Sequence, residues 1–450
     1  MWAPVDRVLV ARGTRVGDET EAAMVAQAVQ QRVYTPTEPS SLRAAGLTDS
    51  EVEGLILKFL AARGDASGFA ISDQVKLPYA LVVECLTRLK DARLLGYRGS
   101  ASMNDFVYQI TDHGRDTARR LAHRSTYFGA APVSLEDYID SVVAQGITDH
   151  TPTPADLAMA FEDLLLDPET VERLGPAIAS GKGMFLFGPS GNGKTSIAQR
   201  ITRSLGGNIW VPRAIGVDGE IVRIFDPHFH VEVDFDWEYQ HGMAHPVDRR
   251  WVLIQRPTVS VGGELTMDQL EVSTNPHTGI SEAPLQLKAN GGTLVIDDFG
   301  RQRMRIDDLL NRWIVPLEAG YDFYSLSSGR RIQMPFQQVI VFSTNLEPRD
   351  LVDEAFLRRI PYKIPVGDPT EGQFRELFDL VGAELGVALA PGAVDHVIRV
   401  HYRHENRPLR FCHPRDLLLQ VLNEARFRGV EAVLTETTSD RAVDSYFSII

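Results

Sequence analysis

A glycine-rich segment that ends in lysine and threonine is the strongest chemical signal in the sequence. It matches the pattern G-x-x-x-x-G-K-[ST] and consists of Gly188, Pro189, Ser190, Gly191, Asn192, Gly193, Lys194 and Thr195, with Ser196 next. Glycines let backbone amides approach phosphate oxygens, and a helix N-terminus after the loop adds its positive end. In such a loop the Lys194 ammonium reaches the β- and γ-phosphates, and the Thr195 hydroxyl binds Mg²⁺. The segment therefore predicts a site for nucleotide phosphates.

Two acids follow an apolar run further along the chain. Thr293–Ile296 predicts a buried strand, and it ends in Asp297 and Asp298. Beside a phosphate-binding loop, we expect Asp297 to coordinate Mg²⁺ and Asp298 to polarise the attacking water as a general base. Alone, the same pattern also fits a strand that meets a turn. The functional interpretation therefore depends on the loop upstream.

An amide and three arginines complete the set of candidate residues. Asn345 follows the predicted strand Val339–Ser343, where its side chain can orient water against the γ-phosphate. Arg358 and Arg359 end a short predicted helix, and they suit the nucleotide of a neighbouring subunit better than the chain's own. Arg415 opens a helix near the C-terminus and can reach back over the bound nucleotide. The alternative for each residue is a plain surface or capping role.

These residues need a parallel sheet to position them. From residue 154 to 367, apolar strands alternate with helical segments, which predicts an α/β domain with a mostly parallel sheet flanked by helices. Residues 368–450 carry helical signals only and predict a helical lid. Between the loop and the two acids, residues 208–277 exceed what a minimal core needs and predict a β insert. Its expected strands are Ile221–Phe225, Val231–Phe235, Trp251–Gln255 and Thr258–Val261.

The order and spacing of these elements resemble the AAA+ ATPases over about residues 154–430. The resemblance places Lys194 and Thr195 in the Walker A motif and Asp297 and Asp298 in the Walker B motif. It makes Asn345 the sensor 1 residue, Arg358 or Arg359 the arginine finger, and Arg415 the sensor 2 residue. It implies ATP and Mg²⁺ as cofactors and a homo-oligomeric ring, usually a hexamer, with nucleotide between subunits. Members of the family usually have Glu where Asp298 stands. Because aspartate is one methylene shorter but can still act as a base, we expect ATP hydrolysis that is reduced rather than absent.

A predicted hairpin narrows the resemblance to one branch of the AAA+ family. The segments Phe323–Leu326 and Arg331–Met334 flank a turn just before the Asn345 strand. This placement resembles the presensor-hairpin branch of AAA+, which contains magnesium-chelatase subunits, MoxR-type chaperones and enhancer-binding activators. The β insert would then face the ring pore or a partner. Histidines of the insert offer a metal site as an alternative, but no cysteine joins them, and we favour solvated or core roles for His228, His230, His241 and His245.

The N-terminal part predicts a separate small domain. Residues 1–46 are predicted to form an extension and linker with one weak helix at Asp18–Gln31. Residues 126–153 are predicted to form a second linker. Residues 47–125 follow the order helix, short segment, helix, hairpin, helix, a layout similar to a winged helix. Residues 46–125 hold eleven basic and ten acidic residues, which is weak support for phosphate binding. A basic stripe on its last helix is either a DNA-facing surface or a solvated face: Arg115, Arg119, Arg120 and Arg124.

Composition limits the function classes. The formal charge of −14 argues against a chain coated all round for nucleic acid, and no apolar run is long enough to cross a bilayer. Two distant cysteines exclude a disulfide framework, and we expect a cytoplasmic globular protein. Three readings remain: a ring that remodels or assembles a protein partner, a DNA-directed ATPase, and a nucleotide switch that barely hydrolyses. The acidic charge favours the protein remodeller over the DNA-directed ATPase. The presence of candidate sensor and arginine-finger residues disfavours the nucleotide switch.

Overall fold

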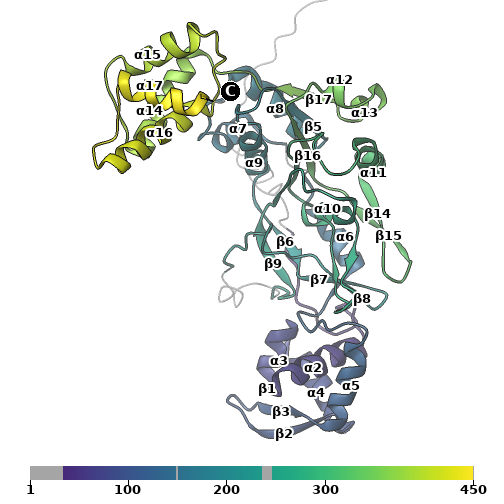
Figure 1. The fold of residues 1–450 in the computed structure, drawn as a ribbon. Helices are drawn as coiled ribbons and strands as arrows, with labels where there is room; N and C mark the ends of the chain where they lie inside the picture. Colours follow the sequence, from purple (N-terminus) through teal and green to yellow (C-terminus); the bar gives the residue numbers. More distant parts are fainter. Residues whose placement is uncertain (1–33, 148–150, 236–245, 449–450) are drawn as a thin grey trace, which may run out of the picture. The chain divides into compact units, whose positions relative to one another are not determined.

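The computed structural model describes residues 34–147, 151–235 and 246–448 (Figure 1). The weak helix predicted at Asp18–Gln31 lies outside the described residues, as do His241 and His245. Within the described residues, no helix is long and apolar enough to span a bilayer.

A five-stranded parallel sheet forms the centre of the α/β domain. Its strands, in spatial order, are β10 (Thr258–Val261), β13 (Thr293–Ile296), β16 (Val339–Thr344), β5 (Met184–Phe187) and β17 (Tyr362–Pro365). Every pairing is parallel, so all five carboxyl ends meet at one edge. All residues of β13 and β16 are buried, as expected for a sheet covered on both faces. The predicted α/β fold is therefore confirmed.

Helices cover the two faces of this sheet. On β13 and β16, alternate side chains point to opposite faces and enter two different apolar clusters. One cluster contains side chains of α11 (Ile306–Ala319) and α13 (Glu354–Arg359). The other contains side chains of α7 (Pro154–Ala160), α8 (Pro168–Ala179) and α9 (Lys194–Ser204). Apolar spacing predicts a helix over Pro154–Leu166, but α7 ends at Ala160, and residues 161–163 form a turn.

The region predicted as a β insert contains one strand of the core. Thr258–Val261 was assigned to the insert, yet it is β10, paired in parallel with β13. Val231–Phe235 was predicted as a strand but forms only a single bridge, between Glu232 and Ile254. The remaining strands belong to smaller sheets: β6 (Asn208–Pro212) with β9 (Trp251–Gln255), and β7 (Ala214–Val217) and β8 (Glu220–Arg223) with β4 (Val133–Ser134), β11 (Ser273–Thr274) and β12 (Ser281–Glu282).

The predicted hairpin before the third core strand is present. Strands β14 (Tyr321–Ser325) and β15 (Arg331–Pro335) pair antiparallel, and β15 leads into β16. Short helices complete this half of the chain: α6 (Leu135–Ala144), a 3₁₀ helix at Met267–Leu270, α10 (Leu285–Lys288) and α12 (Pro348–Leu351).

The N-terminal module follows the predicted order of elements with two differences: the short segment after the first helix is itself a helix, and an unpredicted strand precedes it. It contains α2 (Asp49–Arg63), β1 (Asp65–Ser67), α3 (Gly68–Val75), α4 (Tyr79–Asp91), β2 (Leu95–Ser100), β3 (Phe106–Ile110) and α5 (Asp112–Ala122). Thr48, Glu51 and the apolar spacing after them predict a helix over about Asp49–Arg63, and α2 has these bounds because Thr48 and Glu51 form a reciprocal capping box. The three strands form an antiparallel sheet in the order β1-β3-β2.

The C-terminal part is helical with one small addition. Its helices are α14 (Glu371–Leu385), α15 (Ala393–His396), a π-helix at Val397–Arg403, α16 (His413–Arg428) and α17 (Glu436–Phe447). Only helices were predicted, but β18 (Ala388–Leu389) and β19 (Val433–Leu434) form a two-stranded parallel pair. Side chains of all five helical segments meet in one apolar cluster, for example Phe374, Ala393, Val397, Leu418 and Val443.

Candidate functional site

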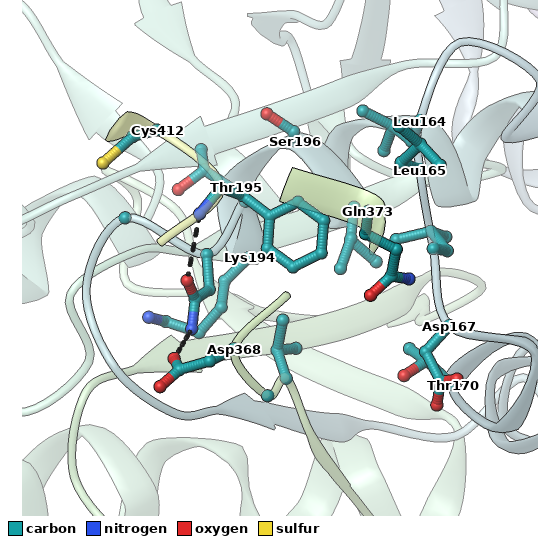
Figure 2. A pocket seen from close by; sticks show the side chains of 18 of the residues that line it. Leu164, Leu165, Asp167, Thr170, Lys194, Thr195, Ser196, Asp368, Gln373 and Cys412 are labelled. Carbon is teal, nitrogen blue, oxygen red and sulfur yellow. Dashed lines mark hydrogen bonds between the residues drawn. The ribbon is translucent and has the colours of Figure 1, made fainter. Parts of the chain in front are cut away.

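A cavity of about 1230 Å³ lies at the carboxyl edge of the parallel sheet. Its lining includes Ser190–Ser196 of the phosphate loop, both acids after β13, Asn345 after β16, and residues of the C-terminal helices. Figure 2 shows Lys194, Thr195 and Asp368 on one side, and Leu164, Leu165, Asp167 and Thr170 on the other. Residues predicted from separate parts of the sequence therefore line one cavity.

Two glycines of the loop allow close approaches that other residues would block. Gly188 has φ of +141°, and a Cβ atom there would lie 2.3 Å from the Val366 carbonyl oxygen. Gly191 has φ of +83°, and its Cβ atom would lie 2.6 Å from Cys412 Sγ. Both positions therefore require glycine. Gly188 and Pro189 themselves do not line the cavity, and their contribution is through backbone carbonyls.

Lys194 lies at the start of α9 with its ammonium held among three oxygens. Its Nζ donates to the carbonyls of Gly188 (2.8 Å) and Pro189 (3.0 Å) and to Asn345 Oδ1 (2.7 Å). Burial lowers the pKa of Lys194, while the carboxylates of Asp297 and Asp298 act in the opposite direction. The contact with Asn345 brings the residue predicted to orient water next to the residue predicted to bind phosphate.

The two predicted Mg²⁺ ligands contact each other. Thr195 Oγ1 donates a hydrogen bond of 2.7 Å to Asp297 Oδ2, across 102 positions of sequence. The other carboxylate oxygen, Asp297 Oδ1, accepts from the backbone N–H of Asp298 at 3.0 Å. A hydroxyl and a carboxylate are hard oxygen donors of the kind Mg²⁺ prefers. The donor set therefore fits the ion that the sequence predicts.

Asp298 has a left-handed backbone, with φ of +48°. It is exposed and lines the cavity, and its carbonyl accepts from Arg301 N at 2.9 Å in a tight turn. Aspartate and asparagine adopt this region more readily than longer side chains do. The turn therefore gives a physical reason for the shorter acid at a position where the resembled family usually has Glu.

The three arginines have different surroundings. Arg358 is exposed and pairs with Glu354 at 3.1 Å, and Arg359 Nε donates to Glu318 Oε1 at 2.6 Å. Neither of these two arginines lines the cavity. Arg415 does line it, and its guanidinium pairs with Glu384, which also lines the cavity. The structure thus brings Arg415 to the chain's own site but not Arg358 or Arg359.

A set of contacts between the loop and the C-terminal helices was not predicted. Asn192 Nδ2 donates to Asp368 Oδ1 at 2.6 Å, and Asn192 Oδ1 accepts from Phe411 N at 3.4 Å (Figure 2). Cys412 N donates to the Gly191 carbonyl at 2.9 Å. No motif signals these contacts, because they join residues more than 170 positions apart. They attach the loop to the segments that directly precede α14 and α16.

The histidines of the insert do not form a metal site where the structure describes them. His230 is buried, its Nδ1 accepts from Asp226 N at 3.0 Å, and its Nε2 contacts the Lys288 carbonyl at 2.8 Å. Burial lowers the pKa of His230, so the ring stays neutral. His228 is exposed. His230 therefore lies in the core, and His228 lies at the surface.

Comparisons with known proteins give a partial match. A family model described as a domain of unknown function (DUF8689) matches residues 370–445. No curated protein matches the chain. Among solved structures, the Thermotoga maritima RuvB Holliday junction branch migration motor is 12% identical, with a TM-score of 0.37, over 63% of this chain and 70% of that chain. NtrX from Brucella abortus in complex with ADP is 14% identical, with a TM-score of 0.39, over 61% of this chain and 54% of that chain.

Proposed function

We propose that this chain is an AAA+ ATPase that binds Mg-ATP in the cavity and, as a ring, couples hydrolysis to remodelling or assembly of a protein partner. The observation that carries the proposal is the convergence of four predicted residues through two hydrogen bonds, Lys194 with Asn345 and Thr195 with Asp297. Strand β16 lies between β5 and β13 in the sheet, so Asn345 lies between the phosphate loop and the acids.

Each residue has a distinct task in this proposal. Thr195 and Asp297 hold Mg²⁺, which neutralises charge on the phosphates, and Lys194 contacts the same phosphates as a cation. Asp298 takes the proton of the attacking water, and Asn345 orients that water. The apolar wall that includes Leu164, Leu165, Leu377, Leu380 and Val381 suits the flat face of adenine.

Features outside the cavity support the assignments of the AAA+ branch, the arginine fingers and the N-terminal module. The hairpin β14–β15 directly before β16 is what the presensor-hairpin branch of AAA+ leads us to expect. Arg358 and Arg359 lie outside the chain's own cavity, which fits fingers that act on a neighbouring subunit. The element order of residues 47–125 supports a winged-helix module, to which we assign recruitment of the partner or assembly of the ring.

Asp298→Asn should keep ATP binding and lose turnover by about 10²–10⁴-fold, because the amide keeps the shape but cannot accept a proton. Asp297→Asn should instead raise the Mg²⁺ concentration needed for half-maximal activity, since one charged ligand is lost. Phosphate release and nucleotide binding, each measured over a Mg²⁺ series, separate the two effects. Wild-type turnover by Asp298→Asn would identify another residue as the base. Asp308→Asn is the matched control, an exposed acid outside the cavity lining.

Binding to duplex DNA should be weak and should fall steeply with salt. Residues 46–125 hold eleven basic and ten acidic residues, and on α5 Arg119 pairs with Asp116 at 3.0 Å, so the module offers little net positive charge to phosphates. Fluorescence anisotropy of a labelled short duplex at two salt concentrations measures this. A salt-resistant, sequence-specific complex would favour a DNA-directed ATPase over a protein remodeller.

A further inference from the structure

Two histidines and an aspartate of the C-terminal helices meet outside the nucleotide cavity. His396 Nε2 lies 2.8 Å from Asp440 Oδ1, and His401 Nε2 lies 2.7 Å from the same oxygen. One ligand atom of each residue lies within 4.8 Å of the others. The cavity lining includes none of the three. This cluster therefore calls for an explanation of its own.

The π-helix accounts for the meeting of the two histidines. They are five positions apart, and in an α-helix five residues turn by about 140° beyond a full rotation, which would separate the rings. His401 instead lies in the π-helical segment Val397–Arg403 that continues from α15. A π-helical turn has an i to i+5 repeat, so it returns His401 to the side of His396. Such turns are frequent at functional sites.

Glu436 occupies the position of an orienting partner. It lies on α17 one helical turn before Asp440, and its Oε1 lies 3.7 Å from His396 Nδ1. Histidines that bind metals commonly direct the second ring nitrogen to a carboxylate, which fixes the tautomer and leaves the first nitrogen free for the ion. His396 has this arrangement, with Nε2 toward Asp440 and Nδ1 toward Glu436.

We propose that His396, His401 and Asp440 bind Zn²⁺ through two imidazole nitrogens and one carboxylate. This donor set suits Zn²⁺, whereas Mg²⁺ prefers oxygen donors alone. The Asp440 side chain is 44% exposed and the histidine side chains are 14% and 9% exposed, so the ion has a solvent path and an open position for water. The ion would link α17 to α15 and to the π-helix that continues from it. The proposal does not depend on nucleotide binding.

The competing explanation is a metal-free hydrogen-bond cluster in which both imidazole N–H groups donate to Asp440. Asp440→Asn distinguishes the two, because the amide oxygen still accepts hydrogen bonds but the anionic ligand is lost. Glu436→Gln tests the orienting role, and His404→Gln is the matched control, since His404 is an exposed histidine on the same stretch.

The experiment titrates the chelator-treated, full-length chain with Zn²⁺ alone, without nucleotide, against a chromophoric chelator. Wild type and His404→Gln should bind one more tight Zn²⁺ than Asp440→Asn. Glu436→Gln should bind that ion about 10-fold to 100-fold more weakly than wild type. Equal Zn²⁺ stoichiometry and affinity in wild type and Asp440→Asn would overturn the proposal.

A second readout keeps the test valid if Asp440→Asn folds poorly. Co²⁺ in place of Zn²⁺ gives visible absorption bands that report imidazole ligation, and His396→Gln should remove them. Zn²⁺ should also raise the Tm of wild type and not that of His396→Gln, because an ion bound only by the folded chain stabilises it. Unchanged bands in His396→Gln would contradict the assignment. A loss of ATP binding alone would leave the zinc result unaffected.

Discussion

Lys194→Ala should reduce ATP affinity by at least about 100-fold and abolish turnover. Lys194 is 7% exposed and lines the cavity, where low local dielectric strengthens the contact of its ammonium with phosphate. A hydrogen bond to a charged group contributes about 1.5–3 kcal/mol, and the ammonium can donate to more than one phosphate oxygen. The alanine variant leaves that phosphate charge without a cation. Binding of a fluorescent ATP analogue, with phosphate release measured in parallel, checks the prediction.

Lys182→Ala provides the control for this variant. Lys182 is exposed, precedes strand β5 and does not line the cavity. Its replacement removes the same charge from the same part of the chain and should leave both measurements unchanged. Equal ATP affinity in wild type and Lys194→Ala would rule out the assignment of the phosphate loop.

The double variant Arg358→Ala/Arg359→Ala should bind ATP with wild-type affinity and lose turnover by about 10³–10⁵-fold, the range typical of arginine fingers. Neither arginine lines the chain's own cavity, so both can serve catalysis only at another subunit's nucleotide. Mixing this variant with Lys194→Ala supplies intact fingers on one subunit and intact phosphate loops on the other. Partial return of ATPase activity in the mixture is the expected result.

Arg415 provides the alternative, because it lines the cavity and can neutralise the γ-phosphate within one subunit. In that case Arg358 and Arg359 are surface charges, as their pairs with Glu354 and Glu318 also allow. Mixed subunits would then show no more activity than either variant alone. Lack of rescue, together with full activity of Arg358→Ala/Arg359→Ala, would contradict the finger assignment.

The sequence predicted the elements whose signals are local. Helix α2 was predicted from Thr48, Glu51 and apolar spacing, and it has the expected bounds because the capping box determines its start. The core strands β13 and β16 read as apolar runs followed by polar residues, so the edge of the sheet that carries the site could be predicted. These cases share a property: the signal lies within the element or directly after it.

Pairing partners and long-range contacts could not be predicted in the same way. Thr258–Val261 reads as a strand, but nothing in four residues tells whether it pairs with the insert or with β13. The bond of Asn192 with Asp368 joins distant loops and leaves no pattern. His396 and His401 are spaced for opposite sides of an α-helix, so only the π-helix reveals their cluster with Asp440.

The most direct test of the central claim measures phosphate release from ATP by the wild-type chain across a range of protein and Mg²⁺ concentrations. The proposal predicts release that requires Mg²⁺ and a rate per subunit that rises with protein concentration, because each site needs residues of a neighbour. Absence of Mg²⁺-dependent release at every concentration, from a folded chain, would contradict it.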